Sequence, residues 1–183
     1  MKKIAIFASG EGSNFKAIYE KIISRDIPAE ISIVVSNNSN CGAINFAKKN
    51  ILPTLIVNKT RYPNPDTRNM MLKQNLLKAD VNLICLAGYM KMIPENIVAH
   101  FKNCILNIHP AILPAFPGLD AQKQAINHGV KYSGCTVHFV DEEVDAGLIL
   151  VQAIVKVKND DTEETLSKRI LAKEHKAYPE AVR

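Results

Sequence analysis

The segment Asn107-Ile108-His109-Pro110 carries the residue types best suited to catalysis. Side chains two residues apart in an extended chain lie on the same side, so we expect Asn107 and His109 to point the same way. An amide donor beside an imidazole can stabilise an oxyanion and move a proton, which are the two requirements of acyl transfer. The alternative is that His109 only forms a structural hydrogen bond near the proline-rich segment that follows it.

A carboxylate that could pair with this imidazole is Asp145, in the acidic stretch Asp-Glu-Glu-Val-Asp-Ala-Gly at residues 141–147. The neighbouring acids add to the negative potential around Asp145, and a carboxylate in that position could hold an imidazolium. Acidic clusters are more often solvated turns. Spacing alone does not place Asp145 next to His109.

A third segment, Ser9-Gly10-Glu11-Gly12-Ser13-Asn14, has the composition of a phosphate-binding loop. We expect it between the first strand and the first helix, where free backbone amides and the helix dipole attract anions. Phe15 occupies the position of the third glycine of a dinucleotide-binding loop, and the Gly-Lys-Ser/Thr of a P-loop is missing. The alternative is a strand-to-helix turn in which glycine supplies the backbone angles and Ser13 or Asn14 caps the helix.

The hydrophobic pattern predicts the scaffold that positions these segments. Continuous apolar runs suit strands buried on both faces, and they occupy residues 4–8, 31–35, 52–57, 81–87 and 104–108. Helical periodicity occurs between them, at residues 14–23, 41–49 and 66–78. The alternation predicts an α/β, doubly wound fold with a mostly parallel sheet and helices on both faces. Ligands of such sheets bind beyond the carboxyl ends of the strands, where Asn107 and His109 fall.

Beyond residue 110 the pattern predicts an antiparallel edge to this sheet. A proline-rich loop leads to a short helix at about residues 120–128. Two further strands, at residues 134–140 and 148–158, flank the acidic stretch as a hairpin. Asp161 and Glu164 have capping-box spacing, so a last helix is expected from about Thr162 to Ala177, ending before Pro179.

The composition is typical of one folded domain with small anionic ligands. Of 183 residues, 47% are hydrophobic and 22% charged, which suits a globular domain. The formal charge of +5 favours anionic partners, but aromatic residues make up only 6% and no nucleic-acid-binding motif occurs. Four scattered cysteines without a CxxC pair predict free thiols in a reducing compartment. No apolar stretch is long enough to span a membrane, so a cytoplasmic location is expected.

Together these segments resemble the folate-dependent glycinamide ribonucleotide formyltransferases (phosphoribosylglycinamide formyltransferases). The similar stretches run nearly end to end: FASGEGSNFKAI, LICLAGYMKMIP, ILNIHPAILPAFPGLDA, GCTVHFVDEEVDAGLILVQ and KEHKAYPE. The combination of NIHPxxLPxFPG with a VDxG loop about 35 residues later is specific. The resemblance implies the formyltransferase fold in a single domain over residues 1–183. Its nucleotide phosphate-binding half would cover about residues 1–100, and its folate-binding and catalytic half about residues 101–183.

The resemblance also implies a role for each matching residue. The catalytic set is Asn107, His109 and Asp145. Residues implied to bind the nucleotide substrate are Gly12, Ser13, Asn14, Leu171, Ala172, Lys173 and Glu174. Residues implied to bind the folate are Arg68, Met90, Lys91, Met92, Ile93, Asn107, Asp141, Glu142, Glu143, Val144 and Asp145.

Two of these residues have more specific implied roles, and several have plainer alternatives. Glu174 is similar to the acid that fixes the glycinamide end of the nucleotide, and Arg68 to the arginine that meets the glutamate tail of the folate. Otherwise Glu174 is one of many helix acids and Arg68 a solvated helix residue. The side chains at 90, 92 and 93 could equally be ordinary core.

The implied reaction is transfer of a formyl group from 10-formyltetrahydrofolate to the amine of glycinamide ribonucleotide, in purine biosynthesis. Asn107 and His109 would stabilise the oxyanion, while Asp145 would raise the basicity of the imidazole. No covalent intermediate is needed. No metal is expected, because the other histidines lack paired ligand spacing. Among them, His138 is expected in the core or on the surface, with a place beside the active site as the alternative.

Three alternatives to this reaction stay open. Formyltetrahydrofolate hydrolases and other 10-formyltetrahydrofolate-dependent formyltransferases, such as the methionyl-tRNA enzymes, have a similar fold and donor. Both normally carry an additional domain, for which this chain is expected to have no room. The third alternative is a noncatalytic nucleotide- or folate-binding protein. The expected partners are the two substrates, without nucleic acid or membrane, and the expected state is a monomer or homodimer.

Overall fold

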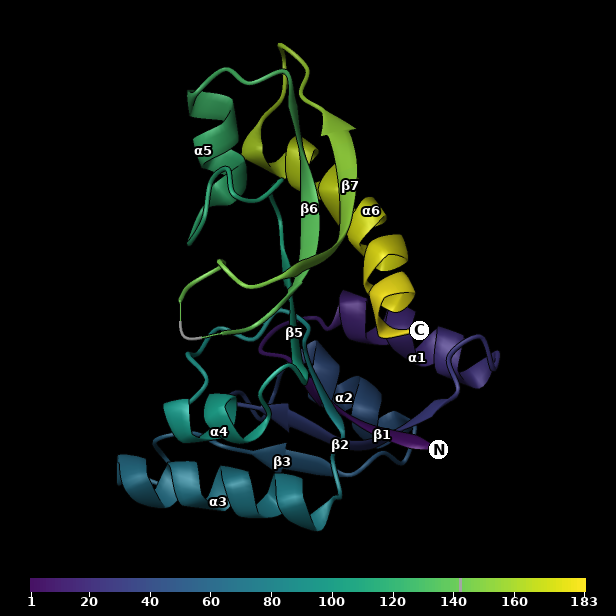
Figure 1. Ribbon diagram of the computed structural model, residues 1–183, viewed down its shortest axis with the longest axis vertical. Helices are drawn as coiled ribbons and strands as arrows, with labels where there is room; N and C mark the ends of the chain where they lie inside the picture. Colours follow the sequence, from purple (N-terminus) through teal and green to yellow (C-terminus); the bar gives the residue numbers. More distant parts are fainter. Residues whose placement is uncertain (142) are drawn as a thin grey trace.

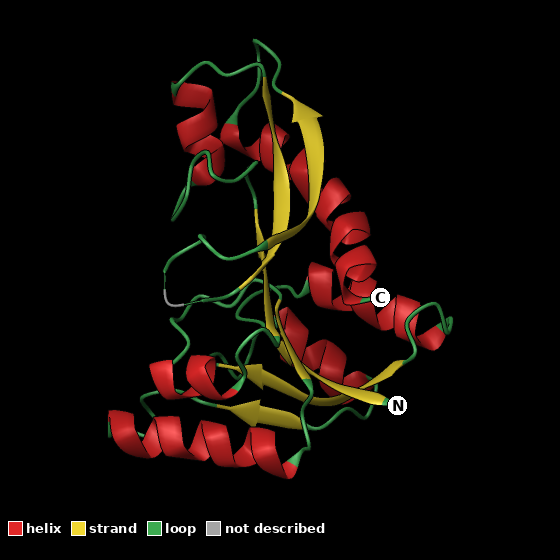
Figure 2. Cartoon of the chain, viewed as in Figure 1, coloured by secondary structure: helices red, strands yellow, loops and turns green. Residues whose placement is uncertain are grey.

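The computed structural model describes residues 1–141 and 143–183 and contains a seven-stranded sheet with helices on both faces (Figures 1 and 2). The strands are β1 (Lys2–Phe7), β2 (Ala29–Ser36), β3 (Thr54–Ile56), β4 (Leu83–Leu86), β5 (Ile105–His109), β6 (Tyr132–Phe139) and β7 (Ile149–Lys156). The helices are α1 (Ser13–Ile23), α2 (Gly42–Lys49), α3 (Pro65–Lys78), α4 (Glu95–His100), α5 (Ala121–Asn127) and α6 (Glu163–Val182).

Continuous apolar runs form strands in the middle of this sheet because both of its faces are covered. In β1, Ile4 and Ile6 pack into the core under α1, α2 and α6. The alternate residues Ala5 and Phe7 pack into a second core under α3 and α4. Both sides of each central strand therefore need apolar side chains.

The strand order is β3-β2-β1-β4-β5-β6-β7, and the neighbours from β3 to β5 pair in parallel. The pairs β5–β6 and β6–β7 are antiparallel. This confirms the predicted doubly wound α/β sheet with an antiparallel edge. The order reverses between β1 and β4, and such a reversal opens a crevice at the carboxyl ends of the strands.

Three local features differ from what the sequence led us to expect. The short helix α4 was not expected. The last helix does not end before Pro179, because α6 continues through it to Val182. The hydroxyl of Tyr178 explains this continuation, since it lies 3.1 Å from the carbonyl oxygen of Leu86 and 2.9 Å from that of Leu106. This buried contact holds the helix against β4 and β5, and such packing outweighs the local preference of proline.

The start of α6 also differs from the prediction. Thr162 caps the helix in a capping box with Thr165, in place of Asp161 with Glu164. Asp161 instead pairs with Arg169 and accepts a hydrogen bond from the backbone N–H of Lys158 at 2.7 Å. The hydrogen bond from Arg169 is the main reason that the pKa of Asp161 falls to about 2.

All four cysteines carry free thiols, as predicted. Cys85 and Cys135 are fully buried in the sheet. Burial raises the pKa of Cys135 to about 12 and raises that of Cys85 as well. Among the described residues, no helix has both the length and the apolar character needed to cross a membrane.

Candidate active site

The catalytic candidates on β5 lie at the carboxyl end of that strand, beside the antiparallel edge. In the register of β5 with β6, Asn107 is opposite His138 and His109 is opposite Thr136. Their side chains therefore share one face of the sheet, as the alternation predicted. His109 is buried and Asn107 half-buried.

The structure brings Asp145 to this pair. Its Oδ2 lies 3.3 Å from Nδ1 of His109, and its Oδ1 accepts a hydrogen bond from the Asn107 amide at 3.4 Å. The side chains of His109 and Asp145 are only 5% and 9% exposed, so their attraction is little screened by water. Asp145 thus contacts both residues on β5, which spacing alone did not establish.

Both ring nitrogens of His109 lie beside acceptor atoms. Nε2 lies 2.8 Å from the carbonyl oxygen of Phe116, while Nδ1 faces Asp145. Both partners are acceptors, so only the imidazolium donates to both at once. The site can therefore hold a protonated imidazole beside a carboxylate, which is an arrangement suited to charge stabilisation and proton transfer.

His138 is buried, as expected for a core residue, but it also adjoins this group, which confirms the alternative. Its Nδ1 donates to its neighbour's carbonyl, Phe139 O, at 2.8 Å, which leaves Nε2 as an acceptor in the neutral ring. The Asn107 amide lies 3.3 Å from that Nε2, and Asp145 Oδ1 lies 3.5 Å from it. His138 therefore orients the Asn107 amide. Its place opposite Asn107 in the predicted sheet was the signal that could have identified it.

Two backbone groups of the proline-rich loop complete the site, and sequence reasoning missed both. One is the carbonyl of Phe116, which contacts Nε2 of His109. The other is the N–H of Gly118, which donates to Asp145 Oδ2 at 2.8 Å. Asp145 itself has a φ of 55°, a conformation that few residues other than glycine, asparagine and aspartate adopt readily. The carboxylate is thus held by both its own backbone and a neighbouring loop.

The predicted phosphate loop lies between β1 and α1. Gly12 caps α1 with a φ of 70°, and a Cβ there would lie 2.7 Å from Cβ of Ala43. Only glycine fits this close approach to α2. No side chain caps the helix, so the capping role considered for Ser13 or Asn14 is wrong. Ser13 is the first residue of α1, half-buried beside the loop.

Asn14 instead points to α6, where two predicted nucleotide-binding residues meet. Its amide donates to Glu174 Oε2 at 2.7 Å, and both side chains are buried. Burial raises the pKa of Glu174, and the hydrogen bond from Asn14 opposes that rise. The Asn14 Oδ1 is buried without a partner among the described residues, so this pair retains an acceptor for a bound donor. Of the other residues on this turn, Leu171 is half-buried, and Ala172 and Lys173 are exposed.

The predicted folate wall after β4 is tied to the phosphate loop through Ser9. The backbone N–H of Met90 donates to Ser9 Oγ at 2.8 Å, and Ser9 Oγ donates to Asn37 Oδ1 at 2.6 Å. Met90 and Met92 are 70% and 80% exposed, which excludes the core role for both. Lys91 is exposed as well, whereas Ile93 is a core residue.

The remaining folate candidates lie at the surface. Arg68 is half-buried on α3 and donates to the carbonyl of Tyr62 at 2.9 Å. The structure shows no contact between Arg68 and the catalytic group. Asp141, Glu143 and Val144 are exposed on the loop that carries Asp145. Glu142 lies outside the described residues.

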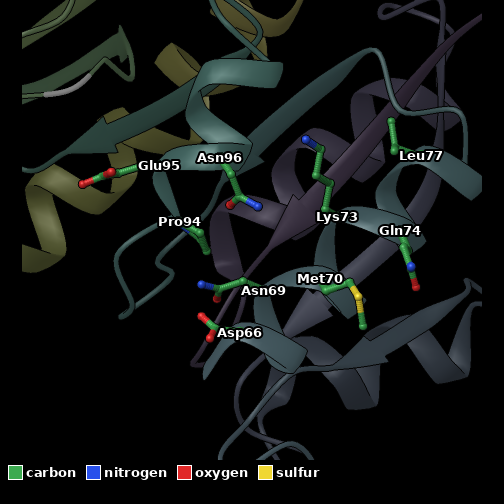
Figure 3. A pocket seen from close by; sticks show the side chains of 9 residues that line it. All are labelled: Asp66, Asn69, Met70, Lys73, Gln74, Leu77, Pro94, Glu95 and Asn96. Carbon is green, nitrogen blue, oxygen red and sulfur yellow. The ribbon is translucent and has the colours of Figure 1, made fainter. Parts of the chain in front are cut away.

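A cavity of about 660 Å³ lies between α3 and α4 (Figure 3). Its lining consists of Asp66, Asn69, Met70, Lys73, Gln74, Leu77, Pro94, Glu95 and Asn96. None of the predicted site residues lines it.

The chain is similar to known proteins over nearly its whole length. Residues 2–182 match the formyl transferase family. The phosphoribosylglycinamide formyltransferase of Bacillus subtilis (strain 168) is 39% identical over 183 residues, which cover 100% of this chain and 94% of that protein. The chloroplastic phosphoribosylglycinamide formyltransferase of Arabidopsis thaliana is 42% identical over 187 residues, but the match covers 99% of this chain and 64% of that protein.

A solved structure supports the same relationship. Glycinamide ribonucleotide transformylase 1 from Symbiobacterium toebii superposes with a TM-score of 0.96 and 43% sequence identity, covering 100% of this chain and 86% of that one. Sequence and fold agree over essentially the whole length. The chain therefore belongs to the formyl transferase family.

Proposed function

We propose that this protein transfers the formyl group of 10-formyltetrahydrofolate to the amine of glycinamide ribonucleotide, in purine biosynthesis. The observation that carries the proposal is the contact of His109 and Asn107 with one buried carboxylate, that of Asp145, at the end of β5. The names of the relatives from Bacillus subtilis and Arabidopsis thaliana support the choice of acceptor.

In the proposed reaction the neutral amine of the nucleotide attacks the formyl carbon. The carbonyl oxygen becomes an oxyanion, which shares the N–H groups of the Asn107 amide and the Nε2–H of the His109 imidazolium with the protein acceptors that these groups contact in the structure. Asp145 stabilises the positive charge on the ring. The bond from carbon to the folate nitrogen then breaks, the amine loses a proton, and the folate nitrogen gains one, with His109 as the group that moves it.

Each substrate has its own proposed surface. The nucleotide phosphate binds the backbone amides at Gly12, Ser13 and Asn14, at the N-terminus of an eleven-residue helix. Its glycinamide end reaches Glu174, beside residues 171–173. The folate lies along residues 90–93 and 141–145, with Arg68 at its glutamate tail. On this proposal, residues up to about 100 form the phosphate-binding half and the later residues the folate-binding and catalytic half. Arg68 and residues 90–93 of the first half also reach the folate, and Glu174 of the second half also reaches the nucleotide.

The remaining expectations are also proposals. We infer a monomer or homodimer that uses neither metal, nucleic acid nor membrane. A cytoplasmic location follows from the free thiols predicted by the cysteine pattern. This location is proposed for the present chain alone, since the name of the Arabidopsis relative places that protein in the chloroplast.

The test is the absorbance change on deformylation of 10-formyltetrahydrofolate by one purified sample, with and without glycinamide ribonucleotide. We expect turnover only with the acceptor present. Turnover that does not require the acceptor would identify a formyltetrahydrofolate hydrolase. Folate binding without turnover would identify a binding protein, and either result would refute the transferase proposal.

A further inference from the structure

Three cross-strand neighbours form a row that starts at the catalytic histidine. His109 on β5 pairs with Thr136 on β6, and Thr136 pairs with Gln152 on the edge strand β7. Paired residues on adjacent strands point to the same face of a sheet, so these three side chains lie side by side. Thr136 is fully buried. Gln152 therefore lies two strands away from His109, outside any contact with it.

Thr136 and Gln152, the second and third members of this row, bind the chain segment that follows His109. The Thr136 hydroxyl donates to the carbonyl of Ala111 at 2.7 Å and accepts from the N–H of Leu113 at 3.0 Å. The Gln152 amide donates to the carbonyl of Leu113 at 2.9 Å and to the Thr136 hydroxyl at 3.1 Å. Three hydrogen bonds thus fix residues 111–113 over the row, and a fourth joins Gln152 to Thr136.

Packing at the neighbouring position supports the same arrangement. A Cβ on Gly134 would lie 2.7 Å from Cδ1 of Ile112, so the absence of a side chain on β6 leaves room for Ile112. The N–H of Ala115 then donates to the carbonyl of Ile112 at 3.0 Å, which closes a turn. The segment leaves this turn directly into Phe116.

The far end of the segment touches both catalytic groups. The Phe116 carbonyl lies 2.8 Å from His109 Nε2, and the Gly118 N–H donates to Asp145 Oδ2 at 2.8 Å. The loop between β5 and α5 is therefore fixed at one end by Thr136 and Gln152, and at the other end it orients His109 and Asp145. A displacement of its fixed end changes the orientation of both groups.

We propose that Gln152 is a positioning residue for catalysis, which acts on His109 and Asp145 through residues 111–118. This inference rests on the proposed formyl transfer for its kinetic readout. Two features distinguish the role from simple stabilisation of the sheet. Gln152 lies on an exposed edge strand, and its donors reach the loop rather than a neighbouring strand's backbone.

The experiment compares Gln152→Met, which keeps the length of the side chain but removes both donors, with the wild-type protein. Lys156→Met is the matched control, because it makes a similar exchange on the same strand at an exposed position. We expect Gln152→Met to lower kcat about tenfold with both KM values nearly unchanged, since a misplaced catalytic group affects the transition state more than binding. Gln152→Lys, whose ammonium can donate to both oxygens, should restore kcat to within about threefold.

Hydrogen exchange of the Gly118 amide gives a readout that does not depend on activity. We expect Gln152→Met to speed that exchange about tenfold, and Lys156→Met and Gln152→Lys to leave it near the wild-type rate. If Gln152→Met does not fold, Gln152→Glu serves in its place, because an ionised carboxylate has no donor.

The outcomes separate the two proposals. An unchanged kcat together with unchanged Gly118 exchange would overturn the positioning role while leaving formyl transfer intact. A fall in kcat that Gln152→Lys fails to restore, without a change in Gly118 exchange, would overturn it as well. Absence of acceptor-dependent turnover in the wild-type protein would refute the function alone, and the exchange rates would then decide the role of Gln152.

Discussion

Replacing Asp145 by asparagine tests the central contact of the site with little change in shape. The backbone at this position has a φ of 55°, which asparagine tolerates nearly as well as aspartate and alanine does not. The variant therefore removes the charge and one acceptor without adding backbone strain. An alanine variant would mix the two effects.

The expected size of the effect follows from the hydrogen bonds. The carboxylate contacts His109 at 3.3 Å, Asn107 at 3.4 Å and the Gly118 N–H at 2.8 Å. Hydrogen bonds to a charged group contribute about 1.5–3 kcal/mol, against about 1 kcal/mol for neutral ones. Weakening two of these contacts, and removing the counter-charge of the imidazolium, costs about 3 kcal/mol in the transition state. This corresponds to a fall in kcat of about a hundredfold.

The assay is acceptor-dependent turnover of 10-formyltetrahydrofolate, with folding checked by urea denaturation. Asp120→Asn is the matched control, because Asp120 is an exposed aspartate with a φ of 56° and its side chain forms no capping hydrogen bond. We expect wild-type kcat from the control. A kcat of Asp145→Asn within threefold of wild type, or a change confined to KM, would refute the assigned role of the carboxylate.

Three further predictions concern other parts of the molecule. Ile51 is 92% exposed with a φ of 57°, so Ile51→Gly should raise the free energy of unfolding in urea by about 1 kcal/mol, and equal or lower stability would contradict this strain. Because folding raises the pKa of Glu174, protonation of this side chain favours the folded state. This contribution to the stability of the protein is full below the ordinary pKa of 4.5 and is lost as the pH rises through the folded-state pKa. As the pH rises from 4.5 to neutral, the free energy of unfolding in urea should therefore fall less for Glu174→Gln than for the wild-type protein. Parallel pH profiles of the two proteins would argue against the raised pKa. Ser9→Ala removes the acceptor of the Met90 N–H and should raise the KM for the folate about fivefold, leaving the KM for the nucleotide unchanged. An equal rise in both KM values would show that Ser9 does not act on the folate wall selectively.

The central strands were predictable because both faces of the sheet are covered, which makes each strand a continuous apolar run. The segment at residues 104–108 is an example, since Ile105 packs into one core and Leu106 into the other. Helix α4 escaped prediction because its six residues are too short to display helical periodicity. The end of α6 was misplaced because the contacts of Tyr178 are made with residues far away in sequence.

The site was only partly predictable, for a similar reason. The strand pattern put Asn107 and His109 on one side. The position of Asp145 depends on the hairpin between β6 and β7 and on its unusual backbone angle, neither of which residue types reveal. The Phe116 carbonyl and the Gly118 N–H are backbone groups, so no motif marks them. Only the folded loop brings them to the catalytic side chains.

The buried thiols make chemical labelling informative for this protein. Cys85 and Cys135 are fully enclosed, and both have raised pKa values, so neither presents a reactive thiolate to a dissolved reagent. Both thiols lie in the core that α6 covers, so a maleimide can reach them only after this core opens. The labelling rate at these two positions would thus report how often the core between the sheet and α6 opens, with no need for an introduced probe.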